Sequence, residues 1–600
     1  KLDDRHPYIL LDSNKCILCG RCVRYCGDLI GVHALGFINR GYETVVKPAL
    51  DKTLCETTCI ACGNCIEVCP TGAITFKATL DKPGPFRTVP YRSVCSFCGV
   101  GCEIDVNHTG RDFFYVTATP SDPFTEGELC AKGRFGTYYV GSRDRLYACT
   151  VKGKGSVGMA DAAAALAAGL RGIRDTHGLD AILFLASPRV STEAAWLFAS
   201  LAKHCGSRFV FPAEDLRRAA LPDAGGLSGH NISTAKQDDV LGAGVVVTVG
   251  EHVFAYNPVF GFKIRRAAQN GAAWIHVGPA PTAWKRLVTL HVDCTAGEEA
   301  TALGAICGAV VAKGAYDAEG LAAIANGQAF LSHVFGQPGP GVAEAAALIA
   351  DASKRVVLAV NQDAPMGSDH ADVRWAADLA LLTGRTGGAK GGLLVVKNDA
   401  NGQGVQDILY GGGFTSAADL EKAKSLLAAG KIKAVVLLGV DPAGIDGLEA
   451  ALGTAHFTAA VDMFRTSATD RADVVVPLCP LQEEDGSVVS FDGRITTFRK
   501  AFKPLTGFSN AEFLAEALAQ AGGARLDLAA TRAAIAGALP LYRALAAGAP
   551  TAYLCDEAAT AGIDRAFRMA SVSSSTGRAA YQSATTFSRV AEAKVRADVS

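Results

Sequence analysis

The sequence predicts an α/β protein preceded by a cysteine-rich N-terminal part. From about residue 155, short runs of Val, Ile and Leu alternate with Ala-rich helical stretches, which is typical of parallel sheets covered by helices on both faces. Thirteen of the 19 cysteines lie between Cys16 and Cys130, far more densely than in the remaining chain. At 600 residues, the chain has room for about three to five domains.

Composition and charge exclude several classes of protein. Hydrophobic residues make up 49% of the chain and charged residues 20%, which can fill several cores and excludes global disorder. With 58 basic and 59 acidic residues the net charge is −1, whereas a nucleic-acid binder needs a basic surface. No apolar run approaches the roughly 18 residues of a membrane span, so we expect no direct membrane span.

The placing of the thiols indicates metal centres in a reducing compartment. A disulfide scaffold would be short, secreted and evenly crosslinked, but this chain is long and shows no charged-then-apolar leader. The chain begins at Lys1 without a Met, which leaves open whether residues precede it. We expect a cytoplasmic protein, or one held on the cytoplasmic face of the membrane through partner subunits.

Two cysteine runs have the spacing that wraps a [4Fe–4S] cube, because three thiolates can converge from one tight loop. In such paired runs the fourth cysteine of each binds the other cluster. The first predicted ligand set is therefore Cys16, Cys19, Cys22 and Cys69, and the second is Cys59, Cys62, Cys65 and Cys26. Structural zinc is the alternative for C-x2-C pairs, but two complete runs, the second ending in Cys69-Pro70, favour iron–sulfur. Cys55 is interpreted as a buried or spare thiol rather than a ligand.

A third set of four thiols follows at Cys95, Cys98, Cys102 and Cys130, and zinc is again the alternative. The residues from Gly127 to Gly136, with Cys130-Ala131-Lys132 at their centre, resemble the N-terminal [4Fe–4S] domain of the molybdopterin (bis-pterin guanine dinucleotide) oxidoreductase superfamily. In that superfamily a Lys or Arg after the fourth cysteine lies between cluster and pterin. The resemblance implies a third [4Fe–4S] cluster and makes Lys132 a candidate electron relay, against the alternative of a solvated surface lysine.

The resemblance extends over about residues 8 to 505. Its further landmarks are Ser187-Pro188-Arg189 with Glu193, Asn361, Leu381–Gly384, Gly387-Gly388, Asn401–Gly404, Thr469, Ala472–Pro477, Glu484–Gly486 and Gly493-Arg494. Two relatives fit best: the large iron–sulfur subunit of NADH:quinone oxidoreductase (complex I), and next the large subunit of NAD-linked formate dehydrogenases.

We accordingly expect four regions. These are a ferredoxin-like domain with two [4Fe–4S] clusters over residues 1–90, a small [4Fe–4S] domain over 91–150, doubly wound α/β layers of the molybdopterin-oxidoreductase type over 151–500, and an Ala-rich helical tail over 501–600. Helices are predicted at 161–173 (with Asp161 as N-cap), 192–203, 259–269, 420–429, 511–521 and 530–547. Strands are predicted at 181–185, 208–211, 244–249, 273–277, 355–360 and 435–438, and the last thirty residues as a surface tail.

The metal position of a working pterin site is not recognisable in the sequence. Catalytic formate dehydrogenases place a Cys or selenocysteine on the metal after the helix that follows the Ser-Pro-Arg motif, but residues 206–225 hold no cysteine. Cys205 is interpreted as a packed thiol, and nothing marks out Asp215, which could ligate as a carboxylate. No Mo or W ligand is identified.

The dinucleotide contacts also look reduced. Gly250 and Asn257 still suit the approach of a phosphate. Ala280 stands where catalytic relatives usually carry an arginine, which removes a bidentate contact. A C-terminal β-barrel that closes over the pterins is replaced by Ala-rich helix. The resemblance implies molybdopterin guanine dinucleotide, but these departures indicate that its site is degenerate.

Other polar groups are given ordinary interpretations. Glu483-Glu484-Asp485 is interpreted as a solvated loop rather than a carboxylate site, and His252 and His276 as structural histidines rather than bases. No G-x-G-x-x-G follows a predicted strand.

The leading hypothesis is an electron-transfer subunit of a multi-subunit NAD(P)H-linked oxidoreductase. Its partners would be a flavoprotein that oxidises NAD(P)H, a [2Fe–2S] subunit or domain, and a further electron-acceptor subunit, whose acceptor is left open. The alternatives are an active Mo or W bis-pterin oxidoreductase such as a formate dehydrogenase, and a non-redox assembly protein that has kept only the clusters.

Overall fold

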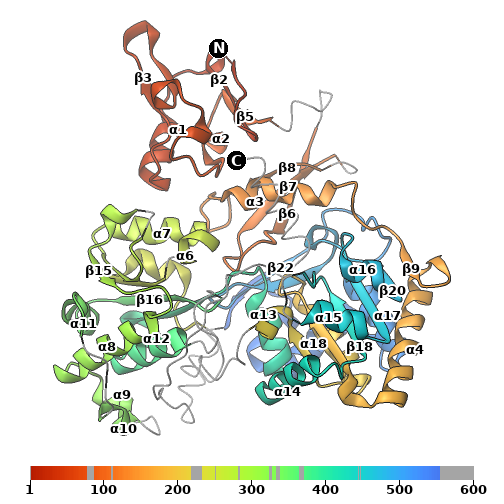
Figure 1. Cartoon of the computed structure of the whole chain (residues 1–600). Helices are drawn as coiled ribbons and strands as arrows, with labels where there is room; N and C mark the ends of the chain where they lie inside the picture. The colour runs from red at the N-terminus through yellow and green to blue at the C-terminus, as the bar shows by residue number, and fades with distance from the viewer. Residues whose placement is uncertain are drawn as a thin grey trace.

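The computed structural model describes residues 2–77, 87–109, 113–217, 233–250, 252–281, 284–322, 327–332, 335, 338–363, 371–443, 445 and 447–554. Two α/β lobes lie side by side in Figure 1, the left one in green and the right one in yellow and blue. A small domain formed by the N-terminal residues lies above them, and the antiparallel strands β6–β8 lie between it and the lobes (Figure 1).

The N-terminal domain is built from short elements around its two cysteine runs. A three-stranded antiparallel sheet, a hairpin and two single-turn helices make it up: β1 (Leu2–Asp3), β2 (Ile9–Asp12), β5 (Ile74–Phe76), β3 (Gly36–Ile38), β4 (Val45–Lys47), α1 (Arg21–Arg24) and α2 (Asn64–Glu67). Gly20 (φ 70°) and Gly63 (φ 69°) precede α1 and α2 in the left-handed conformation that glycine adopts without strain. The two runs therefore share one local design.

The next domain carries the third set of cysteines. Its strands form an antiparallel sheet in the order β6 (Val89–Val94), β7 (Glu103–His108) and β8 (Phe113–Ala118), and its helix α3 (Ala131–Phe135) begins directly after Cys130. Phe135 at the end of α3 leaves this domain and enters the core of the N-terminal domain, where its ring stacks on Tyr8 with centroids 4.6 Å apart. The two cysteine-rich domains thus share apolar packing.

The right lobe contains a sheet with the strand order β10-β9-β20-β19-β18-β11-β12. Its strands are β9 (Cys149–Val151), β10 (Gly155–Val157), β11 (Ile182–Ala186), β12 (Val210–Pro212), β18 (Ala434–Leu438), β19 (Phe457–Asp462) and β20 (Val474–Pro477). Its helices are α4 (Met159–His177), α5 (Thr192–His204), α13 (Gly402–Gln406), α14 (Ala417–Ala428), α15 (Leu448–Thr454) and α16 (Ser467–Arg471). All five residues of β11 and of β18 are buried, as continuous apolar strands in a covered parallel sheet should be.

The left lobe is a parallel sheet in the order β15-β14-β13-β16-β17. Its strands are β13 (Val245–Val249), β14 (Ala273–Gly278), β15 (Leu290–Asp293), β16 (Val356–Asn361) and β17 (Gly391–Val396). Its helices are α6 (His252–Tyr256), α7 (Pro258–Gln269), α8 (Glu299–Ala312), α9 (Ala318–Ala322), α10 (Gly327–Leu331), α11 (Val342–Ala350) and α12 (Ala371–Leu382). The predicted doubly wound α/β architecture is confirmed in both lobes.

The C-terminal part is less purely helical than predicted. It contains an antiparallel sheet of β21 (Gly486–Val489), β22 (Arg494–Phe498) and β23 (Thr551–Tyr553). Along the chain, the helices α17 (Asn510–Gln520), α18 (Leu528–Ala538) and α19 (Arg543–Ala546) come between β22 and β23. The prediction of a single helix over 530–547 is wrong. Helix α18 ends at Ala538, because Pro540 lacks a backbone N–H and cannot continue the helical hydrogen bonding. The last thirty residues lie outside the described residues.

Predicted helix and strand boundaries differ from the structure by a few residues at most positions. Helix α4 begins at Met159 with Gly158 as its N-cap, so the predicted cap Asp161 is instead an acidic residue in the first turn. There its carboxylate faces the positive end of the helix dipole, which explains why both assignments suit an Asp.

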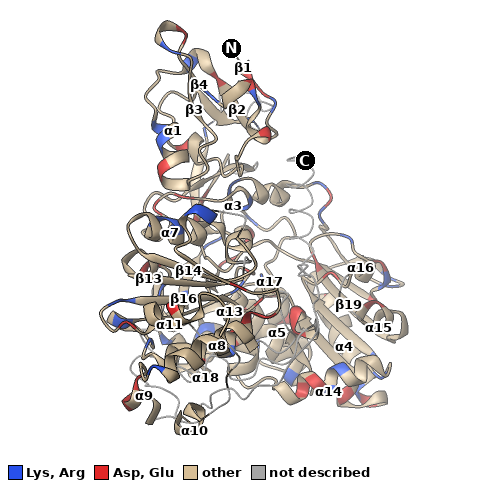
Figure 2. Ribbon diagram, turned by 60° about the vertical axis from the view of Figure 1, so that its left-hand side comes forward, with Lys and Arg blue, Asp and Glu red and all other residues tan. Residues whose placement is uncertain are grey.

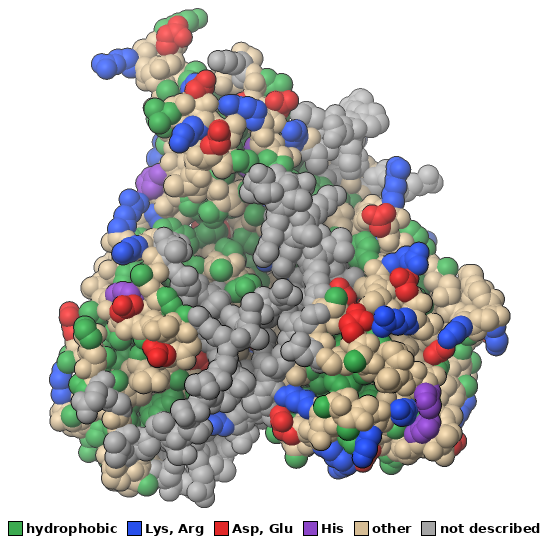
Figure 3. Space-filling model, viewed as in Figure 1, with side chains coloured by type: hydrophobic (Ala, Val, Ile, Leu, Met, Phe, Trp, Pro, Cys, Tyr) green, Lys and Arg blue, Asp and Glu red, His purple; other side chains and the backbone are tan. Residues whose placement is uncertain are grey.

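Within the described residues, no helix combines the length and the apolar character needed to cross a membrane. Figure 3 shows Lys and Arg side chains interspersed with Asp and Glu over the visible face. This mixed distribution agrees with the balanced charge of the sequence.

Candidate functional site

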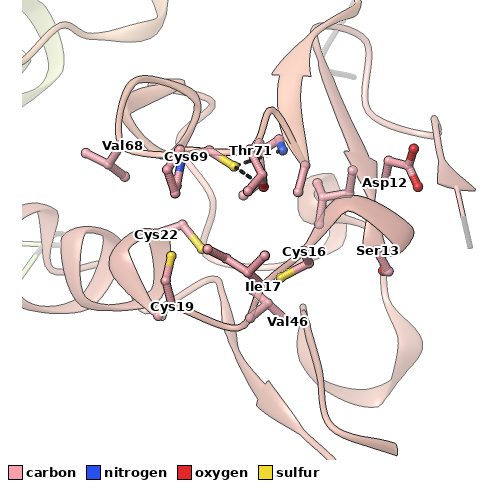
Figure 4. A pocket seen from close by; sticks show the side chains of 15 residues that line it. Asp12, Ser13, Cys16, Ile17, Cys19, Cys22, Val46, Val68, Cys69 and Thr71 are labelled. Atoms are coloured by element: carbon pink, nitrogen blue, oxygen red, sulfur yellow. Dashed lines mark hydrogen bonds between the residues drawn. The ribbon is translucent and has the colours of Figure 1, made fainter.

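The first predicted ligand set surrounds one pocket in the N-terminal domain. Cys16, Cys19, Cys22 and Cys69 all line a hollow of about 450 Å³, open mouth included. Figure 4 shows the first three cysteines on one side of it and Cys69 on the other. The structure therefore brings the last cysteine of the second run to the first three cysteines of the first run.

The loops around these cysteines follow a repeated backbone pattern. Leu18 and Gly20 have positive φ values of 56° and 70°, and Ala61 and Gly63 repeat them at the matching positions of the second run with 53° and 69°. The backbone N–H of Leu18 points at Cys16 Sγ at 3.4 Å, and that of Ala61 points at Cys59 Sγ at 3.4 Å. A residue other than glycine is strained in the left-handed conformation, so the surrounding fold must hold Leu18 and Ala61 in it. In this conformation their backbone N–H groups point at cysteine sulfur atoms.

Cys69 differs electrostatically from its neighbours. Burial opposes its ionisation, but hydrogen bonds from the backbone N–H groups of Ile74 and Thr71 and from the Thr71 hydroxyl lower its pKa overall. Burial instead raises the pKa of Cys22 to about 11. Metal binding must therefore displace a proton from Cys22 against the effect of burial, whereas the lowered pKa of Cys69 makes its proton easier to remove.

The second set also gathers at one place. The charges of Cys62 and Cys26 both act on Cys59, and those of Cys62, Cys59 and Cys26 all act on Cys65. Burial raises the pKa of Cys59 to about 12 and that of Cys62 to about 11. Burial keeps these neighbouring thiols protonated. A cationic metal centre would favour their thiolate forms and displace the protons, so the set is suited to binding metal.

The third set is the most deeply buried. All four thiols are at most 8% exposed, and the charges of Cys95, Cys98 and Cys130 all act on Cys102. Three side chains of the α/β body bind backbone carbonyls of this loop: Arg189 at Ser96, Gln237 at Val100 (3.1 Å) and Arg494 at Gly101 (2.7 Å). The loop is therefore fixed against both lobes.

No three His, Cys, Asp or Glu side chains in the described part of the chain converge on a single ion. A cube does not require this, because its four thiolates bind four different irons around a wider centre. Each donor set consists only of thiols, which are the ligands that iron–sulfur clusters require, so the three sets fit such clusters. Cys16, Cys19, Cys22, Cys69, Cys59, Cys62, Cys65, Cys26, Cys95, Cys98, Cys102 and Cys130 would hold them.

The three sets form a sequence in space. The charge of Cys22, in the first set, contributes to the raised pKa of Cys65, in the second set. Cys130 of the third set acts on Cys62 of the second. The second set therefore lies between the other two, and Cys19 of the first set is the exposed end of the series.

Beyond the third set lie the carboxyl ends of the two parallel sheets. In one sheet the strand order reverses between β11 and β18, and in the other between β13 and β16, which is where ligands bind in open α/β sheets. Arg189, just after β11, forms a buried ion pair with Asp399, just after β17, at 2.6 Å. A Cβ on Gly99 would lie 2.7 Å from the Lys397 carbonyl, so the cysteine loop touches the same region.

The polar side chains at this edge bind one another. The Asn398 amide oxygen accepts hydrogen bonds from Asn361 (2.7 Å) and Asn257 (3.4 Å), and its backbone N–H donates to Asp363 (2.7 Å). Lys397 is fully buried and donates to Gln403 at 2.6 Å. Burial lowers the pKa of Lys397 to about 8, although Asp407 and Asp363 act in the opposite direction.

Lys132 lies beside the third set. Its charge is one of the influences that lower the pKa of Cys98, against the larger opposing effect of burial. Its ammonium group is 6.0 Å from the centre of the Tyr256 ring. This position, between the cysteines and the left lobe, is compatible with the predicted relay.

The interpretation of residues 483–485 as a solvated loop is wrong for two of the three. Glu483 is 1% exposed and holds Arg145 at 2.6 and 2.8 Å. Glu484 is fully buried, and only Asp485 reaches solvent, where it pairs with Lys500. The acidic composition suggested a surface, but a buried arginine partner can only be seen once the chain has folded.

The remaining candidates have structural surroundings. Asp215 accepts a hydrogen bond from the Tyr410 hydroxyl at 2.7 Å, and His276 is buried between Thr248 and the Pro279 carbonyl. Cys205 is buried, as expected for a packed thiol, whereas Cys55 is exposed rather than buried. Helix α6 begins at His252. Residues 218–225 of the predicted metal-ligand segment lie outside the described residues.

Comparison with protein families assigns most of the chain. The model of the molybdopterin oxidoreductase family matches residues 160–507. The chain belongs to this family. The molybdopterin oxidoreductase Fe4S4 domain matches residues 90–142, and the ferredoxin-like domain of NADH-quinone oxidoreductase subunit 3 matches residues 6–75.

Three relatives illustrate the range of this oxidoreductase family. The chain is 29% identical over 542 residues to an NADPH-Fe(3+) oxidoreductase subunit alpha of Geobacter sulfurreducens, covering 83% of this chain and 63% of the relative. It is 25% identical to an NADH-quinone oxidoreductase subunit of Rhizobium meliloti (83% and 61%) and 24% identical to a putative formate dehydrogenase of Staphylococcus haemolyticus (84% and 60%). The chain spans about three fifths of the length of these relatives.

The solved structure of acetylene hydratase from Pelobacter acetylenicus shares the fold. Its TM-score is 0.56 at 12% identity, over 72% of this chain and 69% of the other. The family matches confirm the predicted membership of the molybdopterin oxidoreductase superfamily, and together with this structure they confirm the predicted fold class.

Proposed function

We propose that this chain is the iron–sulfur electron-transfer subunit of a multi-subunit NAD(P)H-linked oxidoreductase and holds three [4Fe–4S] clusters. The observation that carries the proposal is the pocket lined by Cys16, Cys19, Cys22 and Cys69, because it unites the two runs as two-cluster ferredoxin domains do. When bound, such clusters would accept and release single electrons. The chain's own residues would hold them in order and exclude water from the third, whose four thiols are buried.

The order of the three cysteine sets, from an exposed end to a buried one, supports a role in passing electrons between partner subunits. Cys19 is exposed, whereas the third set is buried against the α/β lobes. We infer that a flavoprotein subunit that oxidises NAD(P)H, together with a [2Fe–2S] subunit or domain, would donate at the Cys19 end, and that a further subunit would accept. The printed names of the relatives, an NADPH-Fe(3+) oxidoreductase subunit and an NADH-quinone oxidoreductase subunit, support this choice.

We further propose that the pterin domain has lost its metal. Three observations support this: residues 206–225 contain no cysteine, Ala280 replaces the expected arginine, and the cations at the sheet edge are already engaged, Arg189 by Asp399 and Lys397 by Gln403. A dinucleotide phosphate would have to displace these partners. The scaffold then positions the third cluster and offers docking surfaces.

Elemental analysis of the purified chain tests both parts. We expect about 12 Fe per chain, four for each cube, without stoichiometric Mo or W. About one Mo or W per chain would overturn the loss of the metal and favour the alternative of an active bis-pterin oxidoreductase, with formate as the first substrate to test. Markedly less iron after anaerobic purification and cluster reconstitution would contradict the three-cluster proposal.

A further inference from the structure

The boundary between the second and third cysteine sets is crossed by one buried arginine. Arg134 lies on α3, four residues after Cys130, and its side chain is fully buried. Its Nε donates to the Cys62 carbonyl at 2.8 Å, its Nη2 donates to the Asn64 side-chain oxygen at 2.8 Å, and its Nη1 pairs with Glu67. One guanidinium therefore binds the loop that carries Cys62 and the helix that follows it.

Asn64 completes the link in the opposite direction. Its amide nitrogen donates to the Leu129 carbonyl at 3.1 Å, and its oxygen accepts the Leu129 backbone N–H at 3.1 Å. Leu129 directly precedes Cys130. The loops of Cys62 and Cys130 are thus joined by two side chains, each of which is at most 1% exposed.

Gly63 leaves the space that this arrangement needs. A Cβ on Gly63 would lie 2.3 Å from Arg134 Cδ and 2.9 Å from the Phe135 ring. Gly20, at the matching position of the first run and with almost the same φ, would meet only the ends of Phe37 and Arg24, at 2.9 and 3.0 Å. The equivalent positions therefore differ in one respect, which is the buried arginine.

A second buried arginine holds the other side of the second set. Arg265 on α7 donates to the carbonyls of Gly27 (2.9 Å), Asp28 (2.8 Å) and Leu29 (2.8 Å), just after Cys26. Figure 2 shows α7 directly below the N-terminal domain. The second set is therefore held from two elements, α3 and α7, while Phe135 supplies apolar packing at the same boundary.

We propose that Arg134, together with Asn64, is a positioning residue that sets the separation between the second and third clusters, and that its charge raises the reduction potential of the second. The proposal rests on the three clusters proposed above. With both clusters bound, the electron that the second would lose is the one that the third would gain, so the transfer would make and break no bond. Its rate depends on separation, which the clamp of hydrogen bonds keeps constant. A buried cation beside Cys62 favours the extra negative charge of the reduced second cluster.

The test compares Arg134→Gln with Arg385→Gln. Arg385 is also buried and also binds backbone carbonyls, those of Ile349 and Asp351, but it belongs to the left lobe away from the cysteines. Five readouts are used: iron content, electron paramagnetic resonance of the fully reduced protein, the reduction potential of the second cluster, the rate of electron transfer to the third cluster, and hydrogen exchange of the amides at 59–65 and 129–134. We expect wild type and Arg385→Gln to show magnetic interaction between two neighbouring clusters.

In Arg134→Gln we expect unchanged iron, a weaker magnetic interaction, faster exchange in both loops and a more negative potential of the second cluster. Loss of such an outer partner typically costs about 10- to 100-fold in activity, and we expect electron transfer to the third cluster to slow by a similar factor. Arg134→Lys keeps the positive charge but loses the planar guanidinium that makes several hydrogen bonds at once. Its second-cluster potential should therefore be closer to that of wild type than its magnetic interaction between the clusters.

Gly63→Ala provides a second variant that keeps every charge and thiol. We expect it to weaken the interaction as Arg134→Gln does, whereas Gly20→Ala, with the same backbone strain, should leave it as in wild type. Unchanged coupling, potential and exchange in Arg134→Gln would overturn the positioning role while leaving the three-cluster proposal intact. Absence of the second or the third cluster from the wild type would overturn both proposals.

Discussion

At the scale of single residues, Glu484 is a carboxyl group whose ionisation is strongly opposed by burial. It is fully buried at the turn before β21, and burial raises its pKa to about 8, while the nearby polar side chains of Ser191 and Asn510 oppose the shift and the charge of Glu193 adds to it. Neighbouring Glu483 instead pairs with Arg145 through both of its carboxylate oxygens. Two adjacent glutamates therefore have different electrostatic surroundings.

Glu484→Gln should make stability less dependent on pH. The folded pKa of about 8 lies above the ordinary 4.5, so this residue's contribution is fully present below about pH 4.5 and is lost as the pH rises towards 8. Gln cannot ionise, so the variant should gain about 1–3 kcal/mol over wild type at pH 8 and little at pH 5. Denaturant unfolding at both pH values measures this. Asp485→Asn, at the exposed neighbour, should show no such difference, and equal effects at pH 5 and pH 8 would contradict the assignment.

At the scale of elements, the two cysteine runs are a repeated unit. Each places a left-handed residue two positions after its first cysteine and a left-handed glycine before a one-turn helix. In the proposed ligand sets the fourth cysteine of each run belongs to the opposite run, so neither run would be a site by itself. Cys69 is the clearest instance, since it closes the pocket of Cys16, Cys19 and Cys22.

Cys69→Ser should therefore remove the cluster of the first set and leave that of the second. We expect the iron content to fall from about 12 to about 8 per chain, with the magnetic interaction between the second and third clusters retained. Cys55→Ser is the matched control, because this exposed thiol lies four residues before Cys59 yet belongs to neither predicted set, and it should keep about 12 Fe. Loss of the interaction in Cys69→Ser would instead assign Cys69 to its own run.

At the scale of the whole molecule, the lobes meet where their parallel strands end. The third cysteine loop is fixed there by Arg189, Gln237 and Arg494, and α3 and α7 extend the same body towards the N-terminal domain. This continuity suits a subunit that conducts electrons from one partner to another.

The proposed electron-transfer role, with a separate flavoprotein as donor, predicts that the isolated chain does not oxidise NADH or NADPH. We expect no NAD(P)H-dependent reduction of an artificial acceptor such as ferricyanide above background, whereas dithionite should bleach the iron–sulfur absorbance. Addition of a flavoprotein partner should establish NAD(P)H-dependent bleaching. Oxidation of NAD(P)H by the chain alone would contradict the electron-transfer role, and clusters that resist every reductant would favour the assembly-protein alternative.

The sequence by itself determined the α/β class and the grouping of cysteines, because these depend on local periodicity and on spacings within one loop. Helices such as α5 and strands such as β11 lie within a few residues of their predicted bounds. It could not find the break at Pro540 within an otherwise helical composition, nor the burial of Glu483 and Glu484.

Only the tertiary structure decided which residues join the domains. Arg134 and Asn64 are separated by 70 residues, Arg189 and Asp399 by 210, and Arg145 and Glu483 by 338. Nothing in the local sequence distinguishes these arginines from surface ones, because a guanidinium becomes buried only when distant carbonyls and carboxylates replace its water. Spacing along the chain thus identified the candidate ligands, and long-range packing of charged side chains placed them relative to one another.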